Sequence, residues 1–329
     1  MARKINNSYL LGQSNAPTTG GDMLKIRIDG TPVWEEVDGV EAFLATRTRG
    51  IWGGGDDPSE DYTNLIQYIT IATTGNATDF GDLSSARYRV SGFAAATRGC
   101  FAGGYDGSNQ HTTIEYITIA TPGNTTDFGD LTVARSGSAS CASAVRGLVA
   151  GGSSNVIDYV TIASTGNAIN FGDLTVNRQR VAGCADATRG VFGGGYSPNQ
   201  DTIDYVTIAS AGNAIDFGNL TSDIRQTGAC ADATRGVWLG GYNGSASDNI
   251  DYVTIATTGN AADFGNLTEA RYSGSALASA TRGVLGGGWG ASAYVDTIDY
   301  ITIASTGNAT DFGNLIENGG AQPGSFAGY

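Results

Sequence analysis

The chain has 329 residues, a formal net charge of −14, 50 glycines and one histidine, His111. An acidic net charge argues against nucleic-acid binding, which needs a basic surface. A single histidine cannot form a copper site that needs several histidines, and it argues against a histidine-based catalytic triad. Residues 1–13 carry basic side chains but no apolar run, so we expect neither a signal peptide nor a membrane span.

Two markers recur along the chain, and the first recurs at intervals of 43 to 49 residues. An Arg-Gly pair begins at Arg49, Arg98, Arg146, Arg189, Arg235 and Arg282, and a phenylalanine precedes a glycine at Phe80, Phe128, Phe171, Phe217, Phe264 and Phe312. Such a period is typical of propeller blades. Because the apolar residues within a repeat follow strand periods and never a helical one, we predict an all-β propeller of four-stranded blades, their strands lettered a to d in chain order.

The first part of the chain, residues 8–37, lacks an Arg-Gly pair. Trp34 nevertheless precedes Phe80 by 46 residues, which is one repeat period. The segment around Trp34 then aligns with strand d, and the two segments before it align with strands b and c. We therefore expect residues 8–37 to supply strands b, c and d of a closing blade.

Residues 38–318 contain six repeats, of which residues 181–220 are typical. Strands a to d are expected at 181–187, 190–195, 202–210 and 216–220, and the Gly-Asn pair between c and d suits a turn with left-handed residues. Strand c carries apolar side chains on both faces, as expected if two neighbouring blades cover each sheet. A β-solenoid is the structural alternative, although its turns are usually shorter than these repeats.

The last segment, residues 319–329, has no further Arg-Gly pair, but Phe326 falls where a strand a would lie. We expect this strand to pair with the N-terminal segment near residues 9–14 and so to close a ring of seven blades without free sheet edges. Six blades with an N-terminal hairpin arm are the alternative. Either arrangement makes residues 1–329 a single propeller domain.

The repeated charges indicate structural contacts. The Arg-Gly arginine and the aspartate before the marker phenylalanine lie at the same end of a blade, so we expect ion pairs such as Arg98 with Asp79 or Asp127. Most acidic residues recur with the repeat in this way, and the spacing of the aspartates matches no known calcium loop. We therefore expect no metal, no cofactor and no catalytic residues.

The cysteines are predicted to be free and buried. Cys141, Cys184 and Cys230 occupy the same strand-a position in three successive blades, where a disulfide would be out of reach, and Cys100 lies in a strand b. Free thiols fit assembly in a reducing cytoplasm.

The b–c links vary in length and content, whereas the a–b and c–d links are nearly constant. The b–c and d–a links leave the same face of a propeller, and rigid scaffolds commonly carry recognition on variable loops. Aromatic rings there are suited to packing on sugars or on a protein partner, although capping of the grooves between blades is an equal alternative. The candidate binding residues are Tyr105, His111, Tyr196, Tyr242, Trp289 and Tyr294.

The order of motifs resembles the kelch repeat. It is carried by Gly194-Gly195, Tyr205, Phe217 and Arg225, and earlier by Gly103-Gly104, Tyr116, Phe128 and Arg135, with phenylalanine where kelch units have tryptophan except at Trp34. The segments IDYVTIAS (203–210) and ATRGVFGGG (187–195) are similar in sequence to kelch-like proteins of tailed bacteriophages of the cyanophage type.

This resemblance implies a non-enzymatic structural or receptor-contacting module of a virion, in a tail, fibre or decoration, assembled in the host cytoplasm. The implied partners are other virion proteins and a host receptor or glycan, with several copies in one assembly and no nucleic acid or membrane insertion. Two alternatives remain open from the residues: a lectin-like propeller outside any virion, and a glycoside hydrolase that uses loop carboxylates.

Overall fold

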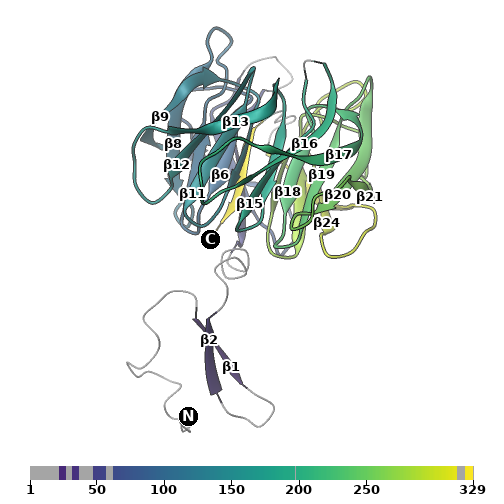
Figure 1. The fold of residues 1–329 in the computed structure, drawn as a ribbon, viewed down its shortest axis with the longest axis horizontal. Coiled ribbons are helices and arrows are strands. Elements are labelled where there is room, and N and C mark those ends of the chain that lie inside the picture. Colours follow the sequence, from purple (N-terminus) through teal and green to yellow (C-terminus); the bar gives the residue numbers. More distant parts are fainter. Residues whose placement is uncertain are drawn as a thin grey trace.

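The computed structural model describes residues 22–26, 32–36, 47–56, 62–196, 198–316 and 323–328. Every regular element among these residues is a β-strand, and the strands form six four-stranded sheets and one two-stranded sheet. The four-stranded sheets stand around a common axis as the blades of a propeller (Figure 1). The prediction of an all-β propeller with four-stranded blades is therefore confirmed.

The four strands of each blade are antiparallel and run from the axis outward as strands a to d. Blade 1 contains β26 (Gly324–Gly328), β3 (Arg49–Gly53), β4 (Leu65–Thr70) and β5 (Thr78–Asp82), and blade 2 contains β6 (Ser91–Ala94), β7 (Arg98–Ala102), β8 (His111–Thr118) and β9 (Thr126–Arg135). Blade 3 contains β10 (Ser138–Ala142), β11 (Arg146–Gly151), β12 (Ser154–Thr161) and β13 (Ile169–Arg178), and blade 4 contains β14 (Ala182–Ala185), β15 (Arg189–Gly193), β16 (Gln200–Thr207) and β17 (Ile215–Ile224). Blade 5 contains β18 (Gly228–Ala231), β19 (Arg235–Tyr242), β20 (Ala246–Thr254) and β21 (Ala262–Asn266), and blade 6 contains β22 (Ser275–Ala278), β23 (Arg282–Gly286), β24 (Thr297–Thr302) and β25 (Thr310–Asn314).

The described residues form six blades, so the expectation of seven is wrong and the six-blade alternative holds. β1 (Asp22–Ile26) and β2 (Pro32–Glu36) pair with each other, with Trp34 opposite Leu24, and neither joins a described blade. β26 pairs with β3, with Phe326 opposite Ile51. The physical reason is that β3 would otherwise expose an unpaired inner edge, whereas β1 and β2 pair within their own hairpin. The segment near residues 9–14, the expected partner of β26, lies outside the described residues.

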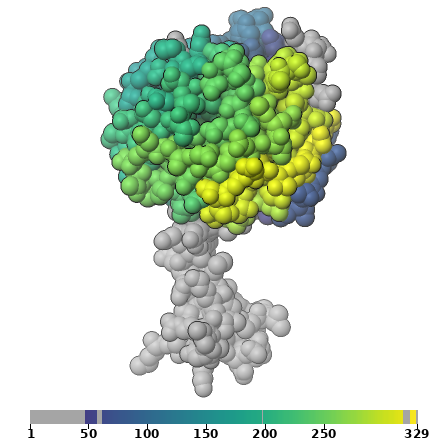
Figure 2. Space-filling model, turned by 90° about the vertical axis from the view of Figure 1, so that its right-hand side faces the viewer, coloured from purple at the N-terminus to yellow at the C-terminus, as the bar shows by residue number. Residues whose placement is uncertain are grey.

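The hydrophobic core lies between neighbouring blades. Val191 and Phe217 of blade 4, for example, pack with Trp238 and Val253 of blade 5. Within each blade the strand-c tyrosine meets the strand-d phenylalanine edge-on, with ring centroids 5.8–6.1 Å apart. Successive blades follow one another around the outer wall, from teal through green to yellow (Figure 2). Each sheet is thus covered on both faces, which explains the apolar pattern of strand c.

The glycine of each Arg-Gly pair allows the inner strands to approach one another. A Cβ atom at any of the six glycines would lie less than 3.0 Å from a strand-a side chain of the preceding blade. The contacting residues are Leu277 at Gly50, Phe326 at Gly99, Phe93 at Gly147, Cys141 at Gly190, Cys184 at Gly236 and Cys230 at Gly283. The marker glycine is therefore a packing requirement of the ring.

The cysteines are free and buried, as predicted. Burial raises the pKa of the Cys100 thiol to about 12. Burial and the nearby charge of Asp232 raise the pKa of the Cys230 thiol, also to about 12. Because the thiolate is the reactive form, these side chains act as small apolar packing groups.

The Gly-Asn turn between strands c and d joins each blade to the preceding one. Gly123 donates its backbone N–H to the carbonyl of Phe80 at 2.7 Å, and Thr125 donates to the carbonyl of Asp82 at 2.9 Å. The Asn124 side chain accepts a hydrogen bond from the backbone N–H of Asp82 at 3.0 Å. The same three hydrogen bonds recur at all six junctions. The turn therefore covers part of the outer edge that strand d would otherwise expose.

The marker arginines also join neighbouring blades, but not through the predicted carboxylates. Arg98 places its guanidinium carbon 4.3 Å from the ring centroid of Tyr116 in its own blade and donates to the carbonyl of Ile162 in the next blade at 2.9 Å. Equivalent contacts occur in all six blades. The Asp79 carboxylate instead accepts the backbone N–H of Gly81. The expected Arg98–Asp79 or Arg98–Asp127 pair is wrong, because the tyrosine holds the guanidinium beside the end of the next strand c.

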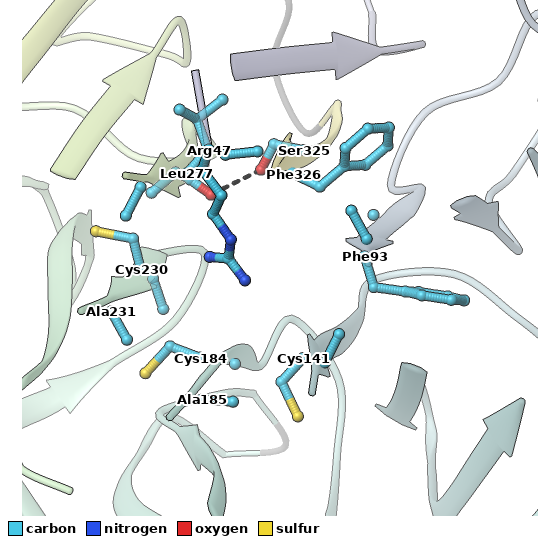
Figure 3. A pocket seen from close by; sticks show the side chains of 18 residues that line it. Arg47, Phe93, Cys141, Cys184, Ala185, Cys230, Ala231, Leu277, Ser325 and Phe326 are labelled. Carbon is cyan, nitrogen blue, oxygen red and sulfur yellow. Dashed lines mark hydrogen bonds between the residues drawn. The ribbon is translucent and has the colours of Figure 1, made fainter. Parts of the chain in front are cut away.

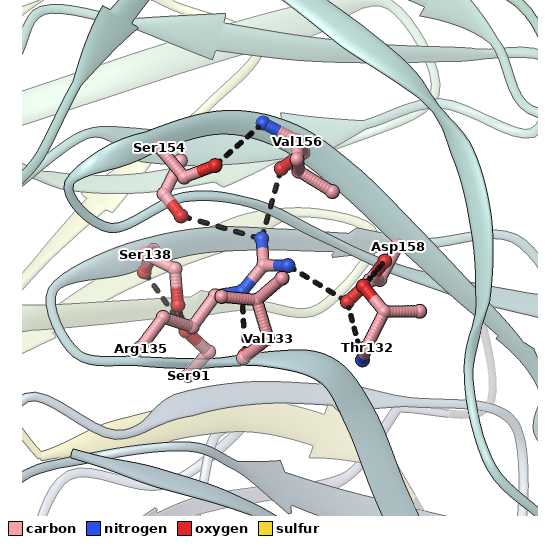
Figure 4. Close-up of polar contacts among 9 residues, drawn as sticks. Ser91, Thr132, Val133, Arg135, Ser138, Ser154, Val156 and Asp158 are labelled. Carbon is pink, nitrogen blue, oxygen red and sulfur yellow. Dashed lines mark hydrogen bonds and ion pairs between the residues drawn. The ribbon is translucent and has the colours of Figure 1, made fainter.

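Buried ion pairs between blades come from a different arginine, which ends strand d or follows it. Arg135 and Asp158 are fully buried, with 2.7 Å between Nη2 and Oδ2 (Figure 4). The Asp158 carboxylate also accepts hydrogen bonds from the backbone N–H and the hydroxyl of Thr132. The corresponding pairs at other junctions are Arg87–Glu115, Arg178–Asp204 and Arg271–Asp299.

At the junction of blades 4 and 5 the arginine position is Ile224, and the neighbouring Arg225 lies one residue further on. Asp251 is retained there, and it accepts a hydrogen bond from the side-chain amide of Asn249 at 2.8 Å. An amide thus donates to the carboxylate where the four junctions named above use a guanidinium. The motif alignment treats Arg225 as the equivalent of Arg135. In the structure Arg135 is buried at this position, whereas in blade 4 the apolar Ile224 takes the position and Arg225 lies one residue after it.

Candidate ligand-binding face

The two ends of the propeller differ in their composition. The a–b and c–d links form one face, called the turn face below, and the b–c and d–a links form the other, called the loop face. On the loop face four of the five described d–a links form an isolated bridge with the start of a b–c link, as in Gln179 with Tyr196 and Tyr272 with Trp289. The variable loops are therefore anchored to the chain that enters strand a, close to the axis.

A channel lined by strands a follows the axis, with cavities at the turn face, in the middle and at the loop face. At the turn-face end Arg47 points into the space beside Cys141, Cys184 and Cys230 (Figure 3). Burial lowers the pKa of the Arg47 guanidinium to about 10. The sequence analysis missed this arginine, because it precedes the first marker pair and has no counterpart in the repeat.

The loop-face end of the channel, called the mouth below, is surrounded by one residue from each described d–a link. These residues have positive φ angles between 55° and 63° and are Arg89, Gly137, Arg180, Gln226 and Ser273. From Gly137 onward, each backbone N–H donates to the carbonyl of the residue before it in this series, at 2.6–3.2 Å. Four of the five are not glycine, and left-handed conformations at other residue types store strain that is typical of functional sites.

Two arginines, Arg89 and Arg180, line the mouth, and a third, Arg225, lies close to Arg180. A Cβ atom on Gly137 would make ordinary contacts with the side chains of Arg180 at 3.6 Å and Arg89 at 3.8 Å, so Gly137 lies between these two arginines. Burial, together with the positive charges of Arg89 and Arg225, lowers the pKa of Arg180. Arg180 Nη1 donates to Oε1 of Gln226 at 3.1 Å. The Nε atoms of Arg180 and Arg225 are buried without a hydrogen-bond partner among the described residues.

Aromatic rings surround these arginines. The guanidinium of Arg225 lies 4.4 Å from the ring centroid of Tyr196 and 4.8 Å from that of Tyr242. Tyr242 in turn packs edge-on against Tyr272 at 5.1 Å. Tyr196 is 38% exposed, so this ring is open to a ligand or a partner.

A second aromatic group lies beside Arg89. Its guanidinium lies 4.6 Å from the ring centroid of Tyr88, which stacks on Tyr62 at 4.7 Å and meets the edge of Tyr105 at 5.9 Å. The Tyr105 hydroxyl donates to the carbonyl of Gly107 at 2.9 Å, which holds its loop in place.

The remaining sequence candidates lie farther along the loops. Trp289 packs edge-on against Tyr294 at 4.4 Å, and the Tyr294 hydroxyl donates to Asp56 of blade 1 at 3.2 Å. His111 begins β8, and its Nε2 lies 2.9 Å from Oδ2 of Asp106. Hydrogen bonds from the backbone N–H groups of Asn109 and Ser108, and then from His111, lower the pKa of Asp106 to about 2.

All six candidates lie at the loop-face ends of their blades, but they form separate groups. Tyr196 and Tyr242 share Arg225, Tyr105 belongs to the group beside Arg89, and Trp289 pairs with Tyr294. The sequence analysis missed the mouth residues Arg89 and Arg180 because it searched only the b–c links for variation. The signal was present in the dipeptides after strand d, which change from Tyr-Arg (88–89) to Gln-Arg (179–180) and Arg-Gln (225–226) between repeats.

No family model matches the chain, and the comparison with curated proteins found no significant match. Within the described ranges, no three or more histidine, cysteine, aspartate or glutamate side chains are grouped so that they could hold a metal ion. The same residues include no helix that is long and apolar enough to span a membrane.

Proposed function

We propose that the protein is a non-enzymatic recognition module that binds its partner through the loop face. The observation that carries this proposal is the difference between the two faces. On the turn face, the same glycine, asparagine and arginine positions form the same hydrogen bonds at six junctions. The loop face carries different residues in each blade, with an exposed tyrosine, several packed aromatic rings and three neighbouring arginines.

These loop-face residues have the chemistry of binding hot spots, in which Trp, Tyr and Arg are enriched. Tyr196 combines an exposed ring with a fixed position, since Arg225 lies over it and Gln179 pairs with its backbone. A rigid amphipathic ring of this kind loses little conformational entropy on binding.

The biological setting that we propose is a tailed-phage virion, in which the protein would be a tail, fibre or decoration component. This part of the proposal is supported by the kelch-like motifs in the sequence. Its partners would be other virion proteins and a host-surface receptor or glycan. Mass spectrometry of purified virions tests the setting, because the proposal requires the chain to be present there.

The binding role is tested with Tyr196→Ala and Trp289→Ala, measured for melting temperature and for binding to a glycan array and to bacterial cell-surface fractions. We expect melting close to that of the parent protein and a loss of binding of about 2 kcal/mol for a hot-spot ring. Arg235→Ala on the turn face is the control, because Arg235 stacks on Tyr252 and donates to Ile303 of the next blade. It should lower stability while the folded fraction still binds.

Loop variants that lose stability and keep binding would show that these rings pack the blades. Loss of binding in the Arg235 variant alone would move the contact surface to the turn face.

A further inference from the structure

We infer that the mouth of the channel is a binding site for an oxyanion, a carboxylate or a phosphate carried by a sugar, with Arg89 and Arg180 as the residues that hold it. This inference names the ligand class of the loop face and therefore rests on the proposed recognition function. It is carried by the positions of Arg89 and Arg180, by the charge around them and by the backbone that holds them at one place.

The charge arrangement is the first observation. The chain is acidic, with a net charge of −14, yet Arg89 and Arg180 line the cavity at the loop face and Arg225 lies close to Arg180. Arg180 and Arg225 form no salt bridge with a described carboxylate, and they donate to the neutral side chains of Gln226 and Asn199. Burial and the neighbouring positive charges disfavour the charged form of Arg180, so an anion beside Arg180 would relieve the repulsion.

The second observation concerns hydrogen-bond donors. Arg89 and Arg180 line the cavity at the mouth, and Arg180 Nη1 donates at 3.1 Å to the neutral Oε1 of Gln226. Guanidinium groups match the planar oxygens of carboxylate and phosphate groups in bidentate geometry, so an oxyanion is the ligand that these two side chains fit.

The third observation is the backbone. Residues that flank the mouth are fixed in the left-handed region, and Gly137 lies between Arg89 and Arg180. The backbone hydrogen bonds around the mouth hold the two arginines at a defined separation. A site whose donors are fixed before binding loses less entropy when the ligand arrives.

The walls of the mouth indicate the rest of the ligand. Next to the arginines the cavity is lined by Ser138, Thr227 and Ser275, whose hydroxyl groups form hydrogen bonds within the ring. Tyr88 and Tyr196 lie beside the cavity through their contacts with Arg89 and Arg180. Aromatic rings are suited to packing on sugars, so a sugar that carries an acidic group fits the mouth better than an inorganic ion.

The experiment is isothermal titration calorimetry of the full chain with four ligands: a glucuronate-containing disaccharide, a hexose phosphate, inorganic phosphate and the neutral disaccharide. We expect binding of the acidic sugars, weaker binding of inorganic phosphate and no binding of the neutral sugar. The uronate and phosphate arms identify which oxyanion is preferred.

Arg180→Gln and Arg89→Gln should each weaken acidic-sugar binding at least about tenfold, which corresponds to about 1.4 kcal/mol. Arg180→Lys should retain part of it, because the charge remains while the planar fork is lost. Arg235→Gln removes the same charge from the turn face and should leave the affinity of the folded protein unchanged.

Absence of binding for every oxyanion, equal binding of the neutral disaccharide, or unchanged affinity in the Arg89 and Arg180 variants would overturn the inference. The proposed recognition function is separable from it. If Tyr196→Ala abolishes partner binding while Arg180→Gln and Arg89→Gln retain it, recognition stands and the oxyanion site does not exist.

Discussion

Replacement of Asp158 by alanine should be among the most destabilising single substitutions in the ring. The change leaves the guanidinium of Arg135 fully buried without its carboxylate, which had been 2.7 Å away. It also removes the acceptor for the backbone N–H and the hydroxyl of Thr132. Removing one partner of a buried ion pair lowers the free energy of unfolding by about 3–5 kcal/mol.

The protein contains a matched control for this substitution. Asp251 occupies the same position in blade 5 and accepts hydrogen bonds from Thr221 and Asn249, but the arginine position opposite it is Ile224. Asp251→Ala therefore leaves no buried arginine without its carboxylate. The free energy of unfolding should fall by only about 1–3 kcal/mol, as expected for the loss of a buried hydrogen-bond acceptor. The difference between the two variants measures the penalty of the isolated guanidinium.

The assay is equilibrium unfolding in urea, followed by the fluorescence of the buried Trp52 and Trp238. We expect Asp158→Ala to unfold at clearly lower urea than Asp251→Ala. Equal midpoints for the two variants would refute the argument, because the stranded arginine would then contribute nothing. As a further check, Arg135→Ile combined with Val156→Asn copies the blade 4–5 junction and should be more stable than Arg135→Ile alone.

Three other outcomes are expected. Cys100 and Cys230, whose thiol pKa values are about 12, should resist alkylation in the native protein at pH 8 and react after unfolding, and native labelling of either would contradict their burial. Asp106, whose folded pKa of about 2 lies below the unfolded value of about 3.9, stabilises its loop above the unfolded value and loses this contribution as the pH falls through about 2; an NMR titration midpoint near 4 would show that its hydrogen bonds are absent. Phe326→Ala should lower the free energy of unfolding by about 3–5 kcal/mol, since its ring is 5% exposed and 4.9 Å from Phe101, and an unchanged melting temperature would count against β26 as the inner strand of blade 1.

The architecture was predictable because the repeat encodes the contacts between blades. The Arg-Gly glycine, the glycine after each marker phenylalanine and the Gly-Asn turn all form the same contacts at six junctions. Each strand-c tyrosine also meets the phenylalanine of its own blade. Residues with these fixed roles recur in fixed register, which is why sequence spacing reveals them.

The blade count was not predictable from spacing alone. Trp34 matches the period of the repeat, but a period does not state which strand edges are left unpaired. β3 has an inner edge to fill, and β26 fills it. The wrong partner for Arg98 has a similar origin, since both candidate carboxylates lie near the correct end of the blade while the actual acceptor is a backbone carbonyl, which no sequence pattern marks.

The mouth of the channel was missed for a different reason. Arg89 and Arg180 come from separate blades, 91 positions apart, and only closure of the ring brings them beside Gly137. The sequence places each one after a buried arginine, where it resembles an ordinary surface residue. The loop face could be predicted from topology, but the convergence of its charges required coordinates.

The pairing of β26 with β3 also fixes the direction in which the molecule faces. Gly328 lies opposite Arg49, so the polypeptide enters and leaves the ring at neighbouring points of the turn face, as the C label below the blades illustrates (Figure 1). A second protein fused at either point would hold the ring at its turn face and leave the mouth directed outward. A fusion on either side of the ring should therefore display the mouth to an approaching surface, and a linker inserted in a b–c loop would obstruct it.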